Sequence, residues 1–510
     1  MVRIVVICCS ILLVAVLPLC ARDEEPVVDV NRRTSEQLSA VGSVGSFVFN
    51  RSAAASFFRH AASYTELWGQ MDWRREDEAF EPALGDGLLL GAFHVASYLR
   101  LDPRSVAYAG ADYENGQKRN VCWNSTSDYE LLRPYVLADS VGGDLQHEQY
   151  RFYGGYARVD GCFNYGLTAS YRAQHEYRQV DPRPRDITAD LSADLSLGYL
   201  WGHYAVGLAG GLRIYKQQQS VAFYDQNGAN TSELHFTGLG TFYQRYSGTT
   251  YTSVQYRGTG WHASLTLVPR ERDGWYALAD YERLVVDRNL TGVNNVTLTT
   301  LNVHTLTAGL AYRRTNERMD WAVKATGTYV LRRGQENILG SGSNSDHLPL
   351  GSQTLYDDHC LNARLEGIVE WKRPSGVWTL SPSAGFYWDS EEYEYPHRKK
   401  EIARMDAGTT LAFTRLHKAW LWKAQAGGYY TAHVDGQFDI PDDTDLRIYN
   451  YLSTSYLRQS DDWATMQAML RVQRSLAPGT AVFVSAAYVK RFYGEKLQDD
   501  NVQLSVGLCF

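Results

Sequence analysis

The amino-acid sequence predicts a single transmembrane β-barrel of antiparallel, up-and-down strands, about 18 in number, with roughly 16 to 20 possible. Three observations lead to this prediction. The N-terminus has the features of an export signal, the C-terminus is an alternating strand that ends on an aromatic residue, and the chain between them repeats amphipathic segments. Each apolar face is about ten residues long, which a tilted strand needs to cross a bilayer.

Residues 1–21 form a predicted signal peptide. Arg3 precedes an apolar run from Ile4 to Leu19, and a charged segment begins at Arg22. This order of a basic start, an apolar core and a polar flank is that of a cleaved secretory signal. No later apolar run reaches the roughly 18 residues that a membrane-spanning helix needs. We therefore expect an exported protein that crosses the bacterial outer membrane with strands.

Residues 22–62 have no clear hydrophobic period, so we expect a segment that lies in the periplasm or is tucked into the lumen. The barrel then occupies residues 63–510. Within the first segment, residues 25–30 are faintly similar to the energy-coupling box of TonB-dependent receptors. Only about 40 residues separate them from the first strand, which is too short for a plug domain of that kind. A plain leader is the favoured interpretation.

From Tyr64 onward the chain consists of paired amphipathic segments. In residues 163–171 the odd-numbered positions are apolar and the even-numbered ones are polar or small. The same alternation predicts strands near residues 64–74, 93–101, 107–113, 150–159, 189–199, 204–214, 261–267, 275–281, 298–312, 321–331, 361–371, 378–388, 405–413, 420–430, 466–472, 482–488 and 502–510. Pro382 predicts a β-bulge, because proline lacks the N–H that a closed sheet requires.

The connections between these segments alternate in length. Short turns, such as 201–203 and 372–376, predict the periplasmic side. Tryptophan and tyrosine cluster beside these turns, which is typical of rings at the level of the lipid headgroups. Long polar connections predict the outer side, and they cover residues 114–148, 216–257, 334–358, 389–401 and 434–461.

The last strand is also the predicted assembly signal. The barrel-assembly machinery of the outer membrane is expected to read its apolar face, which consists of Val502, Leu504, Val506, Leu508 and Phe510.

Charged residues recur at mid-strand in the phase opposite the apolar face. A basic side chain at the bilayer midplane would cost about 2 to 4 kcal/mol if it pointed into lipid, so we expect these residues to line the lumen. The candidates are Arg172, Asp190, Asp194, Arg213, Lys324, Arg364, Glu366, Glu370, Arg404, Asp406, Lys423 and Arg471.

The composition excludes some classes of partner and leaves a disulfide open. A formal net charge of −7 argues against nucleic acid. The cysteines outside the signal are widely spaced and offer no metal motif, and we expect neither metal nor cofactor. Cys122 and Cys360 both fall in predicted loops, where they could pair.

A group of motifs lies between residues 124 and 184. It comprises Ser127-Asp128-Tyr129, Pro134-Tyr135-Val136, Gly142-Gly143-Asp144, Gly154-Gly155-Tyr156-Ala157 and Asp181-Pro182-Arg183-Pro184. With these motifs, nearly the whole mature chain resembles a family of outer-membrane β-barrels from Gram-negative, Bacteroides-like anaerobes. The resemblance implies location and architecture. No catalytic or binding residues are established for that family, so it implies none here.

These features support several functions. A barrel of about 18 strands is wide enough for an aqueous channel, so the first hypothesis is a porin-like channel or accessory uptake pore for a polar nutrient. Opposite charges could instead pair and brace a plugged barrel. A second hypothesis is a non-transport surface or secretion partner. The candidate partners of the barrel in either role are the outer-membrane lipid and a TonB-dependent receptor or surface lipoprotein. The run Tyr243, Tyr246, Tyr251 and Tyr256 could stack on a sugar, although tyrosines are common where strands leave a membrane.

An outer-membrane hydrolase is the least favoured hypothesis. His175, His359 and His433 lie near loop bases, but they have no recognisable spacing to a serine or aspartate partner. The sequence also lacks the GxSxG and HExxH motifs. We therefore expect a protein that is not an enzyme.

Overall fold

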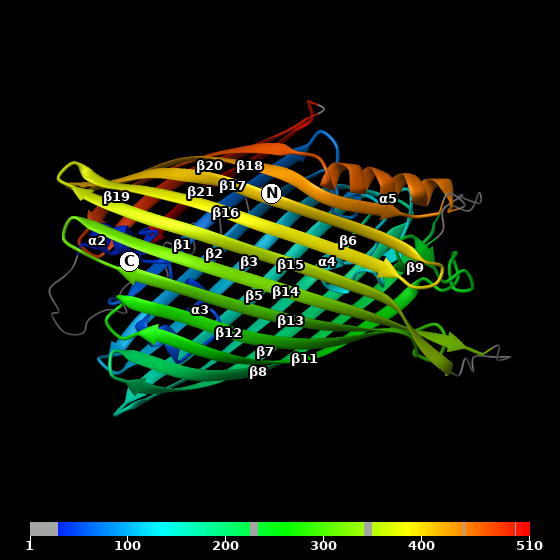
Figure 1. Ribbon diagram of the computed structural model, residues 1–510, viewed down its shortest axis with the longest axis horizontal. Helices are drawn as coiled ribbons and strands as arrows, with labels where there is room; N and C mark the ends of the chain where they lie inside the picture. The colour runs from blue at the N-terminus through cyan, green and yellow to red at the C-terminus, as the bar shows by residue number, and fades with distance from the viewer. Residues whose placement is uncertain (1–28, 225–232, 341–348, 442–443, 495) are drawn as a thin grey trace.

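The computed structural model describes residues 29–224, 233–340, 349–441, 444–494 and 496–510. Within these residues, 18 antiparallel strands form one sheet. The sheet closes because β1 (Tyr64–Glu76) pairs with both β2 (Gly87–Asp102) and the last strand, β21 (Gln498–Cys509). The prediction of a closed up-and-down barrel is confirmed (Figure 1). The predicted signal peptide lies outside the described residues.

Each further strand of the barrel pairs with its neighbours along the chain. These strands are β3 (Ser105–Val121), β5 (Gly143–Asp160), β6 (Phe163–Tyr177), β7 (Arg183–Trp201), β8 (Tyr204–Ala222), β11 (Ser253–Pro269), β12 (Gly274–Leu290), β13 (Val296–Arg314), β14 (Met319–Leu339), β15 (Pro349–Arg373), β16 (Gly376–Tyr393), β17 (Arg398–His417), β18 (Trp420–Asp439), β19 (Trp463–Ala477) and β20 (Thr480–Tyr493).

Two of the long loops that the sequence predicts are mostly strand. β14 and β15 stay paired as far as Leu339 and Pro349, so the predicted loop 334–358 is wrong. β16 and β17 stay paired as far as Tyr393 and Arg398, which corrects the predicted loop 389–401. Beyond the membrane both faces of a hairpin meet water, so the apolar alternation disappears while the backbone ladder continues.

The predicted β-bulge at Pro382 is also wrong. β15 and β16 keep one register on both sides of it, from Glu366 opposite Ser383 to Val369 opposite Leu380. A Cβ built on Gly367 would lie 3.6 Å from the Cγ of Pro382, an ordinary contact distance, so the proline ring fits beside its neighbour on β15 without crowding it. The missing N–H interrupts the ladder locally without shifting its register.

The outer wall of the barrel carries two aromatic belts. The first follows the short turns, as the sequence predicts, and includes Trp275 and Trp378. The second, the extracellular belt, lies toward the long loops and includes Tyr281, Tyr329 and Trp388. On β16 the two belts are ten residues apart, which at roughly 3.3 Å per residue and a tilt of about 40° gives an apolar band about 25 Å tall.

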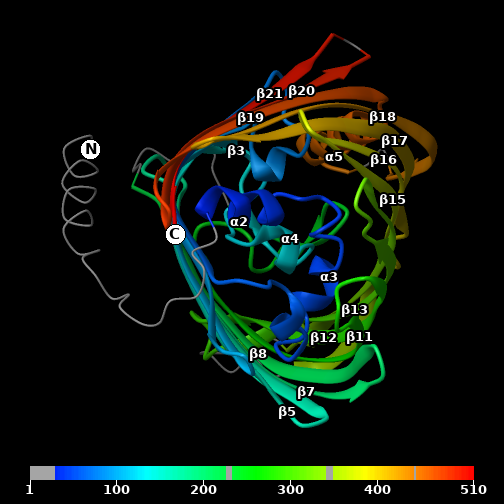
Figure 2. The same cartoon turned by 90° about the vertical axis from the view of Figure 1, so that its left-hand side faces the viewer.

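Two groups of residues lie inside the ring of strands (Figure 2). The first, here called the N-terminal closure, is residues 30–58 at the short-turn end. It contains α2 (Val30–Gln37), α3 (Ser46–Phe49) and the 3-10 turn η1 (Ala55–Phe58). The side chain of Asp29 caps α2 by accepting a hydrogen bond from the Asn31 N–H at 3.1 Å. No helix in the described part of the chain is long and apolar enough to cross a membrane.

The second, here called the extracellular closure after the side on which the sequence predicts the long loops, is residues 122–142, residues 233–248 and α5. Its elements are α4 (Tyr129–Leu132), β4 (Leu137–Ala138), β9 (Leu234–Gly238), β10 (Thr241–Phe242) and α5 (Leu446–Gln459), and the 3-10 turn η2 (Pro82–Leu84) lies beside it. β4, β9 and β10 form a small sheet of their own.

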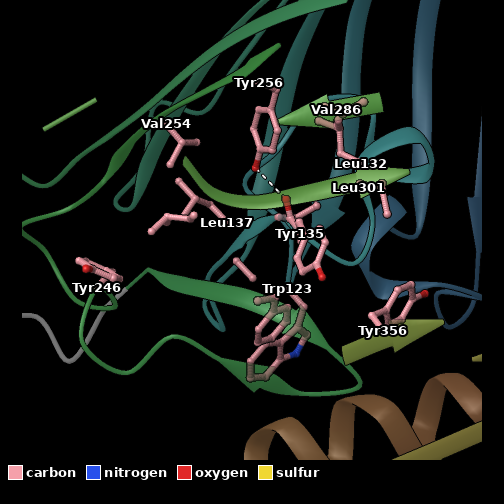
Figure 3. Packing of buried hydrophobic residues seen from close by; sticks show 14 of the residues in the cluster. Trp123, Leu132, Tyr135, Leu137, Tyr246, Val254, Tyr256, Val286, Leu301 and Tyr356 are labelled. Carbon is pink, nitrogen blue, oxygen red and sulfur yellow. Dashed lines mark hydrogen bonds between the residues drawn. The ribbon is translucent and has the colours of Figure 1, made fainter. Parts of the chain in front are cut away.

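The largest buried apolar cluster joins this closure to the inner wall (Figure 3). Tyr135 and Leu137 of the closure pack in one cluster with Leu301 of β13, and the Tyr256 hydroxyl donates a hydrogen bond to the Tyr135 carbonyl at 3.0 Å. Tyr246 is also buried in this cluster. A sugar-stacking surface that includes Tyr246 and Tyr256 is therefore wrong, because both rings fill the interior.

Candidate functional site: the barrel lumen and its closures

One group of predicted lumen residues forms a charge network on β6, β7 and β8. The Asp190 Oδ2 atom lies 2.8 Å from Arg213 Nη2 and 3.4 Å from Arg172 Nη2. Arg172 also reaches Asp128 of the extracellular closure at 2.6 Å, and Arg213 reaches Glu282 of β12 at 3.4 Å. The network therefore links the wall to the segment that closes it.

A second network crosses β14 to β17 on another part of the wall. Lys324 pairs with Glu366, and Glu366 lies 3.6 Å from Arg364. Arg364 in turn lies 3.6 Å from Asp406. The side chains of Arg364 and Asp406 are 38% and 28% exposed although they point inward. This part of the lumen therefore leaves space for water next to charged groups.

Glu370 and Lys423 hold the N-terminal closure in place. The Glu370 carboxylate accepts hydrogen bonds from the Ser39 hydroxyl at 2.8 Å and from the N–H groups of Ala40 and Val41 at 2.8 and 3.3 Å. The Lys423 ammonium donates to the Leu38 carbonyl at 2.8 Å. Both contacts fall on the connection that follows α2.

The remaining predicted residues contact other parts of the interior. Asp194 pairs with His262 at 2.5 Å. Arg404 donates to the last carbonyl of α5, on Gln459, at 3.2 Å. Arg471 pairs with Glu66 of β1 at 2.7 Å. The structure thus distributes the predicted residues over two networks and several separate contacts, and their role in lining a solute path stays a prediction.

Sequence reasoning missed several contacts of the N-terminal closure. Gln473 donates to Asn31 Oδ1 at 3.0 Å and to Thr34 Oγ1 at 2.9 Å. Further along, Arg51 lies 3.4 Å from Asp280. Gln473 carries no charge, so the pattern of charged residues did not indicate it, although it lies in the same strand phase as Arg471.

A mixed aromatic and polar patch on β1 to β3 was also missed. The Trp68 ring stacks on His94 with centroids 4.8 Å apart, and His94 Nδ1 lies 2.8 Å from Asp112 Oδ1. Gln70 accepts a hydrogen bond from the Trp68 indole at 3.2 Å and donates to Asp72 at 2.8 Å. The signal was present in the sequence, because these residues share the inward phase of their strands.

Arg133 fixes the extracellular closure to the wall. Its guanidinium lies 3.0 Å from Glu391, 3.5 Å from Asp358 and 3.8 Å from Asp389. These carboxylates lie on β15 and β16, and all are buried. Lys400 supplies a second positive charge to Glu391 at 2.8 Å. One arginine therefore neutralises much of a buried acidic cluster that would otherwise be unfavourable.

A second pair of carboxyl groups lies within this closure. The Ser125 hydroxyl is 3.0 Å from both Asp139 and Glu233, and Arg178 donates to Asp139 at 2.6 Å. Ser125 has one proton to offer, so it can donate to only one of the two carboxyl groups at a time. Burial, followed by the charge of Asp139, raises the pKa of Glu233 to about 8.

Substituting Glu233 with glutamine is expected to remove a pH dependence of the extracellular closure. A raised pKa means that the folded closure retains the proton between about pH 4.5 and 8, so its stability is highest below this range and falls as the pH rises through it. Hydrogen-exchange protection of residues 122–142 should fall on the order of tenfold or more from pH 5 to 8. The same loss of protection in Glu233→Gln would contradict this assignment.

The histidines of the hydrolase hypothesis are not brought together. His175, His359 and His433 lie on β6, β15 and β18, none of which is adjacent to another in the sheet. Among the described residues, no group of His, Cys, Asp or Glu side chains is arranged to hold a metal ion.

Cys122 and Cys360, which could pair according to the sequence analysis, are both free thiols in the structure. Burial raises the pKa of the Cys122 thiol to about 11.

The predicted assembly strand forms the seam of the barrel. β21 pairs with β20 on one side and β1 on the other, and its ladder continues to Phe510, whose N–H donates to the Thr65 carbonyl at 2.9 Å. Leu504 and Val506 are 44% and 61% exposed on the outer wall. Recognition of this strand by the assembly machinery stays a prediction.

Several solved structures are similar to this chain. The ferric enterobactin receptor PfeA of Pseudomonas aeruginosa, in a double-mutant form, aligns over 88% of this chain and 81% of its own, with 9% identity and a TM-score of 0.38. FpvA of P. aeruginosa, bound to a heterologous pyoverdine, aligns over 87% and 72% with 9% identity and a TM-score of 0.41. A bacterial polysaccharide outer membrane secretin aligns over 88% and 98% with 12% identity and a TM-score of 0.36.

No curated protein matches the sequence. The model of a protein family, described as a family of unknown function (DUF6850), matches residues 52–510. The match covers every strand of the barrel, in agreement with the expected membership of a β-barrel family without an established function. The chain therefore belongs to the DUF6850 family.

Proposed function

We propose that this protein is an outer-membrane channel or accessory uptake pore for a polar solute, and that the N-terminal and extracellular closures gate it. In the conformation described, both closures occupy the lumen, so passage requires each of them to move. The outward apolar band between two aromatic belts supports a location in the outer membrane.

The observation that supports a solute path most strongly is the partial exposure of the inward network on β14 to β17. Glu366 and Lys324 are 27% and 23% exposed, and Arg364 is more exposed still. A barrel that needed only bracing could fill this region with apolar side chains, since buried ion pairs are often no more stabilising than apolar packing. Both signs of charge are present, which favours a neutral or zwitterionic solute over an ion of one sign.

A non-transport surface partner is the second candidate, and the outside of α5 favours it. Leu446 and Leu457 are 72% and 65% exposed on this helix. Exposed leucines beside the outer rim suit contact with a surface protein. An enzymatic role is not proposed.

Current recordings in planar bilayers test the channel proposal. Full-length protein in a salt gradient should show brief openings, and Arg364→Gln should shift the reversal potential toward cation selectivity because it removes a positive charge from the wall. Arg474→Gln, which removes an exposed charge from the outer wall near the short turns, should leave the reversal potential unchanged. The absence of openings, both in this protein and in variants with loosened closures, would contradict the channel and favour the surface partner.

A further inference from the structure

A band of basic side chains crosses the outer wall just beyond the extracellular aromatic belt. Lys216 on β8, Arg257 on β11, Arg283 on β12 and Arg333 on β14 are all exposed. Each shares its strand phase with outward apolar residues of the same strand. For example, Arg283 is in phase with Trp275, which is 45% exposed on the outer wall.

The sheet register places this band relative to the belt. Arg283 lies opposite Trp261 on one side and His304 on the other. Arg257 and Arg333 lie four residues beyond the belt residues Trp261 and Tyr329, or about 13 Å along their strands. Arg283 therefore lies at the edge of the belt, and Lys216, Arg257 and Arg333 lie beyond it, at the level of the headgroups of the outer leaflet.

Most of this positive charge is not neutralised by the protein. Lys216 and Arg257 lie directly opposite each other in the ladder, where like charges are unfavourable. Within the described residues, Lys216, Arg257 and Arg283 have no carboxylate within 4.0 Å. Arg283 instead donates to Asn302 at 3.1 Å. Asp287, opposite Arg257, accepts a hydrogen bond from Thr300, and Asp357 pairs with Arg333 at 3.1 Å.

On two other parts of the wall, the outward charge at this end is acidic or paired. On β5, the outward position beyond Tyr150 is Glu148, whose carboxylate accepts a hydrogen bond from the Tyr150 hydroxyl at 2.7 Å. Between β20 and β21, Lys490 pairs with Asp500 at 3.2 Å. Lys216, Arg257 and Arg283, on the consecutive strands β8, β11 and β12, thus form a group of basic side chains without a carboxylate partner among the described residues.

We propose that Lys216, Arg257, Arg283 and Arg333 bind the phosphate groups of the glycolipid that forms the outer leaflet. Guanidinium groups match phosphate oxygens with paired hydrogen bonds, and an anion between the strands relieves the repulsion between Lys216 and Arg257. The tyrosine and tryptophan rings directly below contact the upper part of the acyl chains. The lipid thus binds the side of the barrel formed by β8, β11, β12 and β14.

Native mass spectrometry of the full-length protein tests this site, with diphosphoryl lipid A as the probe and its chemically dephosphorylated form for comparison. The variant Arg257→Gln/Arg283→Gln/Arg333→Gln should retain at least tenfold less lipid A than the unaltered protein. The matched control Arg158→Gln/Arg415→Gln/Arg474→Gln removes as many positive charges near the short turns, and it should retain as much as the unaltered protein.

Two results would overturn the proposal. One is equal retention of lipid A by the first variant and the unaltered protein. The other is equal retention of the phosphorylated and dephosphorylated lipids, since the site is specific for phosphate. Heat-modifiable migration on gels verifies that each variant is a folded barrel, and the single variant Arg283→Gln, expected to show a partial loss, replaces the triple variant if the latter fails to fold.

Discussion

Replacing Glu370 by alanine is expected to release the N-terminal closure from the barrel wall. This carboxylate is buried and accepts three hydrogen bonds from residues 39–41. A hydrogen bond to a charged group contributes about 1.5 to 3 kcal/mol, and the freed donors recover only part of this with water. A net loss of about 3 kcal/mol would raise the open population of the closure on the order of a hundredfold.

Hydrogen exchange of residues 38–49 measures this release. Exchange should accelerate on the order of a hundredfold in Glu370→Ala. The control Glu392→Ala, which removes a carboxylate that is 52% exposed on the outer side, should leave exchange unchanged. Equal protection in Glu370→Ala and the unaltered protein would show that the contacts of α2, such as that of Gln473, hold the closure without Glu370.

Replacing Arg133 by alanine is expected to release the extracellular closure. The substitution leaves Asp358, Asp389 and Glu391 close together and buried, with Arg332 and Lys400 as the remaining positive charges. Removing one partner of a buried ion pair costs about 3 to 5 kcal/mol. The loop can lower this cost by leaving the lumen, which lets water reach the carboxylates.

Cys360 is a native reporter for this movement. It lies on β15 close to Asp358 and is partly buried. A membrane-impermeant maleimide should label it at least tenfold faster in Arg133→Ala, while the exposed Cys162 at a short turn serves as an internal standard. Asp389→Asn in the same background should slow the labelling again, because it removes one of the repelling charges. Unchanged labelling of Cys360 would exclude Arg133 as the residue that holds the closure.

The barrel could be predicted because a bilayer imposes one simple pattern on every strand. Lipid outside and water inside require alternation with a period of two, and segments such as 163–171 and 502–510 show it without interruption. The strand count follows from these segments. Where hairpins extend beyond the membrane, as in β14 and β15, the pattern stops before the strand does.

The contacts of the closures could not be predicted, because they join distant parts of the chain. Residues 30–58 have no period of their own, and their positions depend on Glu370, Lys423 and Gln473, which come from three different strands far along the sequence. The position of Glu370 and Lys423 in the alternating pattern of their strands indicated only that both side chains point inward. It could not indicate that they bind backbone groups of the chain itself.

The single-channel conductance of Glu370→Ala, Arg133→Ala and the double variant tests most directly whether two closures gate one polar lumen. Because the closures lie in series, each single variant should increase the open probability, and the double variant should increase it by about the product of the two factors. A double variant that is folded but carries no current would contradict a gated lumen.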